Sequence, residues 1–214
     1  MAFDFKKEYK EFYFPPKTPH LVTVPPMNYL AVRGTGDPNE ENGAYKAAIG
    51  LLYGVAFTIK MSKLSDHRIE GYFDYVVPPL EGFWQQEGMA GFDSTRKDLL
   101  HWISVIRLPH FITVTDFNWA VAEAAKKKKQ DVSTVEFLTV HEGLCVQAMH
   151  VGPFDDEPVT VAAMDEFVQK NGYANDFSDE RRHHEIYLSD ARKVEPARRK
   201  TVIRHPVRKV GEPK

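Results

Sequence analysis

The sequence contains a single cysteine, no long apolar run and little net charge. Cys145 is the only cysteine in 214 residues, so no disulfide can form within the chain, and its apolar neighbours favour a packed strand residue over a catalytic thiol. The formal net charge of -2 gives no electrostatic reason to expect direct nucleic-acid binding. No apolar run approaches the roughly 18 residues that cross a bilayer, and the charged N-terminus lacks the apolar centre of a signal peptide. We therefore expect a cytoplasmic protein that does not contact membranes.

The sequence also lacks the short motifs of metal-dependent and nucleophilic enzymes. It has no His-Glu-x-x-His, no cysteine pair and no Gly-x-Ser-x-Gly, and Gly34-Thr35-Gly36 lacks the rest of a phosphate loop. His183 and His184 are adjacent, and neighbouring residues of a strand face opposite ways, so both cannot bind one ion without distortion. We expect no metal and no cofactor. A basic segment from Arg198 to Lys209 is weak evidence for nucleic-acid contact on a near-neutral chain.

What is present is an ordinary globular composition, with 43% hydrophobic and 27% charged residues. Period-two runs predict strands at residues 21–24, 29–33, 71–77, 102–107, 134–140, 144–151, 183–189 and 200–204. Helical spacing predicts amphipathic helices at residues 40–60, from Thr115 into the Lys126–Lys129 run, and from Pro158 to a stop at Gly172. A turn is expected at residues 91–94. The four lysines suit the C-terminal end of a helix, where they would be solvated.

The order strand pair, helix, strand pair occurs twice. It predicts a tandem α+β repeat, in which two antiparallel sheets backed by helices meet about a pseudo-twofold axis and leave a ligand cleft between the halves. We expect an N-terminal arm at residues 1–19 and one domain at residues 20–206. The first half would span about 20–130 and the second about 131–206, followed by a basic tail at 207–214.

The strand around Glu185 is the strongest candidate for a functional site. Alternation places Ile186 and Leu188 on one face and Glu185 with Tyr187 on the other, so a carboxylate and a phenol share a rigid surface. A carboxylate among aromatic rings is poorly solvated, which should raise its pKa and make it a general base or a cation binder. The alternative is that Glu185 faces solvent or pairs with an arginine such as Arg107.

Aromatic side chains could complete such a site by stacking on a planar ligand. The candidates are Tyr72, Phe83, Trp84 and Trp102. Each tryptophan could equally be a core residue. Glu81 stands between proline and glycine and is read as a turn cap, and Asp155, Asp156 and Glu157 as the acidic start of a helix.

Three ordered motifs carry a resemblance to a known family. Pro79-Leu80-Glu81-Gly82-Phe83-Trp84, the segment His150 to Pro158, and Glu185-Ile186-Tyr187-Leu188-Ser189-Asp190 together resemble the GyrI-like small-molecule-binding family over roughly residues 20–206. The resemblance implies duplicated β-α-β-β (SHS2-like) halves and a cleft for flat, lipophilic, often cationic molecules, with Glu185 at its base. About twenty residues precede the first strand, too few for a DNA-binding domain, so the chain looks like a stand-alone form.

Some stand-alone members of this family hydrolyse cyclopropane-bearing DNA alkylators in an aromatic cage, and this chain is similar to that subgroup. In that case Tyr187 would polarise the ligand carbonyl while Glu185 deprotonates the attacking water. Gln85 departs from the family pattern, which favours a second tryptophan there. The alternative function is binding and sequestering of multiple drugs without turnover. Inhibition of a partner such as DNA gyrase follows only from the family name, so a protein partner stays unknown.

Overall fold

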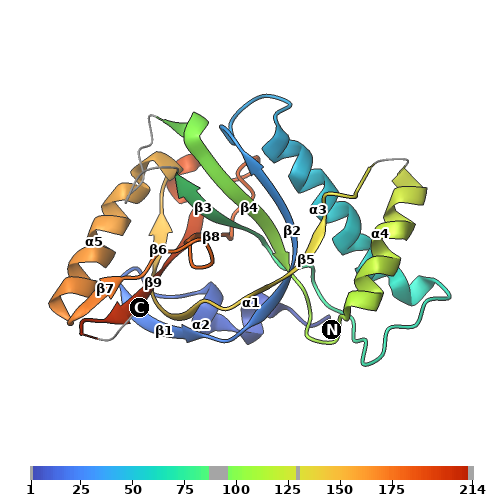
Figure 1. Cartoon of the computed structure of the whole chain (residues 1–214), viewed down its shortest axis with the longest axis horizontal. Helices are drawn as coiled ribbons and strands as arrows, with labels where there is room; N and C mark the ends of the chain where they lie inside the picture. Colours follow the sequence, from blue (N-terminus) through green and yellow to red (C-terminus); the bar gives the residue numbers. More distant parts are fainter. Residues whose placement is uncertain (1, 87–95, 129–130, 212–214) are drawn as a thin grey trace.

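The computed structural model describes residues 2–86, 96–128 and 131–211 as an α+β fold (Figure 1). The predicted turn at residues 91–94 lies outside this part of the chain. The helices are α1 (Phe5–Glu8), α2 (Lys10–Tyr13), α3 (Ala44–Lys60), α4 (Val114–Lys128) and α5 (Glu157–Lys170). Short 3-10 helices are η1 (Met61–Leu64), η2 (Lys97–Leu99), η3 (Phe154–Asp156) and η4 (Pro196–Arg198).

The strands are β1 (His20–Val24), β2 (Met27–Thr35), β3 (Leu80–Gln86), β4 (Leu100–Arg107), β5 (Glu136–Val140), β6 (Gly143–Val151), β7 (Tyr173–Asn175), β8 (His183–Tyr187) and β9 (Lys200–Lys209). They form a nine-stranded sheet in the order β1-β6-β9-β8-β3-β4-β2-β5, and β7 pairs with β9 beside this path. The pairings between these strands are antiparallel.

The expectation of two separate sheets is wrong, because the two halves join into one. β3 pairs with β8 at the centre, with Gly82 opposite Glu185. The outermost strands are also exchanged, since β1 pairs with β6 of the second half and β5 pairs with β2 of the first. Each half is thus a β-α-β-β unit, β2-α3-β3-β4 or β6-α5-β8-β9. The other half contributes one further strand to it, β5 to the first unit and β1 to the second. Because β3 pairs with β8, the backbone N–H and C=O groups of both strands are hydrogen-bonded; in two separate sheets they would stay unpaired at the edges.

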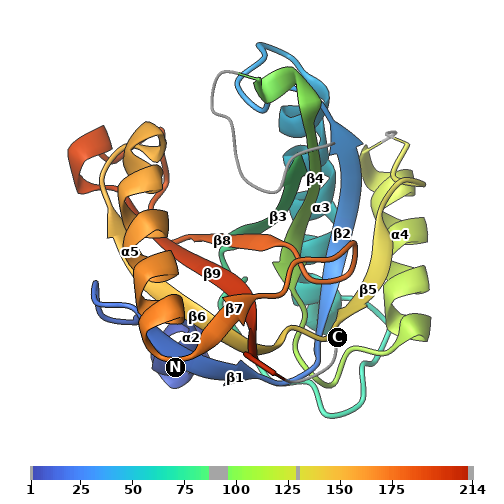
Figure 2. The same ribbon diagram turned by 60° about the vertical axis from the view of Figure 1, so that its left-hand side comes forward.

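Helices α3 and α5 rise on either side of the central strands. Figure 2 shows β3 and β8 between α5 on one flank and α3 on the other. Leu52, Val55 and Ile59 of α3 pack with β2, β4 and α4 in one core cluster, and Met164 and Val168 of α5 pack with β6 and β9 in another. The apolar stripes of α3 and α5 therefore hold the two helices in place on either side of β3 and β8.

The opposite face of the sheet is covered by the N-terminal arm. Phe5, Phe12 and Tyr13 are buried there with Tyr75. The predicted strand at residues 71–77 is wrong, because this segment makes only an isolated bridge between Tyr75 and Phe3. Its aromatic residues, which suggested a strand, pack instead in a cluster of tilted and edge-to-face rings on this face of the sheet.

A buried ionic network lies on this opposite face. His184 is fully buried between Glu81 and Glu142, with 2.9 Å from a ring nitrogen to a carboxylate oxygen on each side. Arg204 donates to Glu142 at 2.9 Å and to the carbonyl of Phe12 at 3.1 Å. Glu81 is thus a buried residue of β3 rather than a turn cap. The network links β8 to β3, β9 and the N-terminal arm on the face of the sheet opposite α3 and α5.

Residues 44–64, comprising α3 and η1, correct the expectation that no segment of the sequence is long and apolar enough to cross a membrane. By length and composition they could cross a membrane. In the fold, the buried face of α3 packs on β2, β4 and α4, as the core helix of a globular protein does. Length and apolarity of this segment are therefore explained by packing.

Candidate functional site

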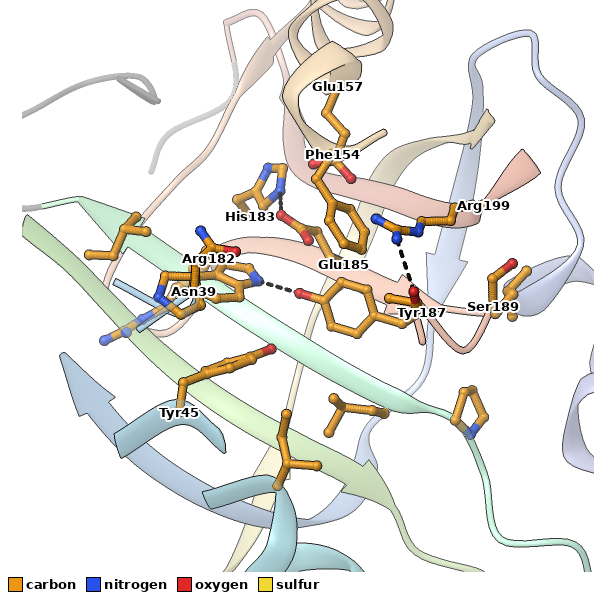
Figure 3. A pocket seen from close by; sticks show the side chains of 18 of the residues that line it. Asn39, Tyr45, Phe154, Glu157, Arg182, His183, Glu185, Tyr187, Ser189 and Arg199 are labelled. Carbon is orange, nitrogen blue, oxygen red and sulfur yellow. Dashed lines mark hydrogen bonds and ion pairs between the residues drawn. The ribbon is translucent and has the colours of Figure 1, made fainter. Parts of the chain in front are cut away.

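A cleft of about 2170 Å³ lies between α3 and α5, above the central strands. Its floor comes from β3 and β8, one wall from α3 and the other from η3 and the start of α5. Figure 3 shows Glu185 and Tyr187 on the floor, Tyr45 on one side, and Phe154 with Glu157 on the other. The duplicated halves therefore leave an open space whose base carries polar groups among rings.

Glu185 sits at the base of this cleft, 9% exposed. Its Oε1 lies 2.9 Å from Nε2 of His183, whose Nδ1 lies 2.7 Å from Nε2 of His205. Burial lowers the pKa of His205 well below its usual value, with a further contribution from His183, so His205 is neutral. Glu185 therefore neither faces open water nor pairs with Arg107, whose guanidinium lies over the rings of Phe5 and Tyr9.

The two histidines fix the hydrogen bond that Glu185 accepts. Nδ1 of His205 is buried without a hydrogen-bond partner. A buried N–H without an acceptor costs more than a bare ring nitrogen, so the proton of His205 belongs on Nε2 and is donated to His183. His183 then carries its proton on Nε2 and donates it to Glu185. This chain of hydrogen bonds orients the carboxylate of Glu185.

Tyr187 lies beside Glu185 on the same face of β8. Its hydroxyl accepts a 3.0 Å hydrogen bond from Nε1–H of Trp84. Burial raises the pKa of Tyr187 well above its usual value, and the neighbouring Glu185 and Tyr45 raise it further, so the phenol keeps its proton. Tyr187 can therefore donate a hydrogen bond to an oxygen in the cleft.

Gly82 makes room for this pair of side chains. A Cβ at residue 82 would lie 2.6 Å from Nε1 of Trp84, closer than real Cβ contacts come, and 3.0 Å from the Tyr187 hydroxyl, tighter than most of them. Tyr45 packs on the other side of Trp84, with 5.3 Å between ring centroids. The glycine in the Glu81-Gly82-Phe83 segment is thus required by side-chain packing at the cleft floor.

The four aromatic residues predicted to bind ligand lie in different parts of the fold. Trp84 lines the cleft, but Trp102 is a core residue that supports Tyr45 from below, with 5.1 Å between their centroids. Phe83 points to the opposite face and stacks on His184. Tyr72 is also away from the cleft and donates to the carbonyl of Lys60. Of the four, only Trp84 is among the residues that line the cleft.

Gln85, where the family pattern favours tryptophan, lies at the rim of the cleft. Its side chain donates to Asp179 at 3.1 Å. Aromatic surface comes instead from Tyr45 and from Phe154, which is 38% exposed and meets Tyr187 edge to face at 5.8 Å. The phenyl, phenol and indole rings that line the cleft therefore come from α3, β3, η3, β8 and, with Phe177, the segment between β7 and β8.

Five residues of the site were not proposed as site residues from the sequence. They are Tyr45, Phe154, Glu157, His183 and His205. Tyr45 was read as part of a helical apolar stripe and Glu157 as a helix-start acid. One signal was available, because His183 and Glu185 are two apart in a strand and must share a face.

Glu157, His183 and Glu185 also form the compact group of possible metal ligands in the described part of the chain. One ligand atom from each lies within 4.8 Å of the others. Two carboxylates and an imidazole would suit a divalent cation. His184 belongs to the opposite face, as alternation predicts, so it cannot join them.

The fold and the cleft define a class of protein: a duplicated α+β module that binds small molecules between its halves. The profile of the GyrI-like small molecule binding domain matches residues 17–208. The chain belongs to the GyrI-like family.

Solved structures agree with this assignment. A conserved protein from Listeria innocua is 48% identical, with a TM-score of 0.90, over 97% of this chain and 100% of its own. Hydrolases from the same organism are 47% and 46% identical, with TM-scores of 0.89 and 0.87 and the same coverage. The EcmrR C-terminal domain shares the fold at 14% identity, with a TM-score of 0.55 over 90% of this chain and 98% of its own. Among curated protein sequences no match was found.

Proposed function

We propose that this protein binds planar lipophilic xenobiotics in the cleft and hydrolyses those that carry a reactive cyclopropane, thereby protecting the cell. The observation that carries the proposal is the pairing of Glu185 with Tyr187 on the floor of an aromatic cleft. Close relatives described as hydrolases support an enzymatic use of the same fold.

The chemistry follows from the two side chains. Glu185 takes a proton from a water molecule whose oxygen bonds to the cyclopropane carbon, and the ring carbon–carbon bond breaks. The electron pair moves through the conjugated system to the ligand carbonyl oxygen, where Tyr187 donates a hydrogen bond to the developing charge. The proton held by Glu185 then passes, through water, to that oxygen, so the carboxylate is regenerated and the net reaction adds one water.

The spacing of the two groups suits this reaction. Glu185 and Tyr187 are two residues apart on one face of β8, so their side chains reach the same part of the cleft floor. A base and a hydrogen-bond donor on one face can therefore contact the same bound ligand. His183 stabilises the carboxylate by donating to it, so His183 is a positioning residue for Glu185.

Incubation with a duocarmycin-type cyclopropane compound, followed by product analysis after denaturation, tests the proposal. We expect wild type to yield the ring-opened water adduct and Glu185→Gln to lose turnover by about 100-fold or more, the usual contribution of a general base. Glu166→Gln, an exposed residue of α5, is the matched control and should retain activity. Equal turnover by wild type and Glu185→Gln would exclude Glu185 as the base.

The second candidate function is sequestering without turnover. The cleft volume of about 2170 Å³ exceeds the roughly 300–1,000 Å³ of most ligand pockets, which favours breadth of binding. A sequestering protein would return the intact compound after denaturation, and the same product analysis would show it.

A further inference from the structure

Glu157 is a buried carboxylate that the proposed hydrolysis does not use. It is the first residue of α5 and is 9% exposed, whereas the preceding Asp155 and Asp156 are exposed. Its Oε1 is buried and has no hydrogen-bond partner. Figure 3 shows the side chain reaching from the helix towards Glu185 on the floor of the cleft. An acid placed only to favour the helix N-terminus would remain in water, as its two neighbours do.

The side chain of Glu157 completes a compact group of three donors. One ligand atom each of Glu157, His183 and Glu185 lies within 4.8 Å of the other two. Two buried carboxylates this close repel each other unless a proton or a cation lies between them. The group therefore brings together donor atoms that a positive ion would hold with less strain than the protein alone.

Basic side chains do not supply this positive charge. Arg182 and Arg199, which line the cleft, donate to backbone carbonyls. Within the described ranges, no ion pair joins a lysine or arginine to Glu157 or Glu185. The repulsion between the two carboxylates is therefore not offset by a basic side chain.

The kind of donor indicates which ion suits the group. Mg²⁺ and Ca²⁺ prefer six or more oxygen ligands, whereas Zn²⁺ binds imidazole nitrogen and carboxylate oxygen in tetrahedral sites. Two donors on one tetrahedral zinc are about 3.3 Å apart, because each lies about 2.0–2.1 Å from the ion. Nε2 of His183 and Oε1 of Glu185 are already 2.9 Å apart. Only the carboxylate of Glu157, at the end of a flexible side chain, has to move closer.

We propose that Glu157, His183 and Glu185 form a site for a divalent transition-metal ion such as Zn²⁺ on the floor of the cleft. Glu157 comes from α5 and the other two donors from β8, so no short sequence motif marks the site. Three protein ligands leave the fourth position of a tetrahedral ion for water or for a molecule in the cleft. The inference goes beyond the proposed hydrolysis and does not depend on it.

His205, behind the site, responds to the ion. A metal bonded to Nε2 of His183 replaces the proton there, so His183 carries its proton on Nδ1 and donates it to Nε2 of His205, 2.7 Å away. Neutral His205 then carries its own proton on Nδ1, which is buried and has no acceptor. This unpaired N–H costs free energy, so we expect zinc to bind more weakly than in a closed four-ligand site. Metal binding thus moves the proton of both rings from Nε2 to Nδ1.

An ion at this site also withdraws Glu185 from proton abstraction. A carboxylate bonded to a metal is a weaker base, because the proton and the ion compete for the same oxygen lone pairs. The zinc-bound state and hydrolysis by Glu185 therefore exclude each other, and zinc should inhibit turnover.

Zinc titration of matched proteins tests the inference. Wild type, Glu157→Gln and the exposed control Glu166→Gln would be stripped with EDTA, freed of it, and titrated in competition with a fluorescent zinc chelator. We expect Glu157→Gln to bind zinc at least about tenfold more weakly than wild type, since even groups that only orient a metal ligand typically contribute 10–100-fold. The control should bind as wild type does. Glu157→His supplies another donor and should restore binding, and circular dichroism would verify that each variant is folded.

¹⁵N NMR of the histidine rings locates the ion. Zinc should move the proton from Nε2 to Nδ1 in both His183 and His205 of wild type. Equal zinc affinity of wild type and Glu157→Gln, or protons that stay on Nε2 in zinc-loaded wild type, would overturn the inference. Turnover of the cyclopropane compound unchanged at saturating zinc would also overturn it. The binding and NMR measurements need no turnover, so a protein that binds zinc here without hydrolysing the compound would uphold the inference and refute the proposed hydrolysis alone.

Discussion

Replacing Gly82 by alanine should disturb both stability and ligand binding, because the glycine makes room for the Trp84–Tyr187 hydrogen bond. The added Cβ would lie 2.6 Å from Nε1 of Trp84, whose ring cannot retreat freely because Tyr45 packs against it. Loss of one buried hydrogen bond costs about 1 kcal/mol and overpacking about 1–3 kcal/mol, so we expect Gly82→Ala to lower the free energy of unfolding by about 2–4 kcal/mol.

Urea unfolding followed by circular dichroism measures the loss of stability, and tryptophan fluorescence with a planar aromatic ligand measures binding. Gly50→Ala is the matched control for the stability measurement, since a Cβ there meets nothing within 4 Å and the residue lies inside α3. Alanine should stabilise that helix by about 0.5–1 kcal/mol. Unfolding and binding of Gly82→Ala indistinguishable from wild type would refute our description of the cleft floor.

Two further predictions concern the faces of β8. Burial alone would raise the pKa of Glu142, but the charges of His184 and Arg204 hold it near about 2, below its usual 4.5. The stabilisation from ionised Glu142 is therefore present above pH 4.5 and lost as pH falls towards 2. It amounts to about 3 kcal/mol. In urea unfolding across that pH range, the free energy of unfolding should decline less steeply in Glu142→Gln than in wild type. On the cleft face, ¹⁵N NMR should find the proton on Nε2 in both His183 and His205, and a proton on Nδ1 of either would contradict the proposed chain to Glu185.

Local pattern predicted most elements of the fold. Strands at 29–33, 144–151 and 200–204 and the helix at 40–60 correspond to β2, β6, β9 and α3. The failures have one cause: a local sequence pattern does not show which segments pair or pack with one another in the fold. The aromatic run at residues 71–77 looks like a strand but packs on the face of the sheet opposite α3 and α5. Glu81 was read as a turn cap, although it lies in β3, which pairs with both β4 and β8.

The site was predictable where it depends on one strand. Alternation placed Glu185 and Tyr187 together, and the structure has both on the cleft floor. Glu157 is 28 residues earlier in the chain and reaches Glu185 only because α5 packs on β6 and β9. Phe83 and Trp84 could not be separated into back and front faces before the register of β3 was known.

The most direct test of the central claim is a crystal structure of the protein with a bound planar aromatic ligand. The account predicts the ligand between α3 and α5, in contact with Trp84 and Phe154 and within hydrogen-bonding reach of the Glu185–Tyr187 pair. A ligand bound elsewhere on the molecule, with the cleft over β3 and β8 left empty, would contradict it.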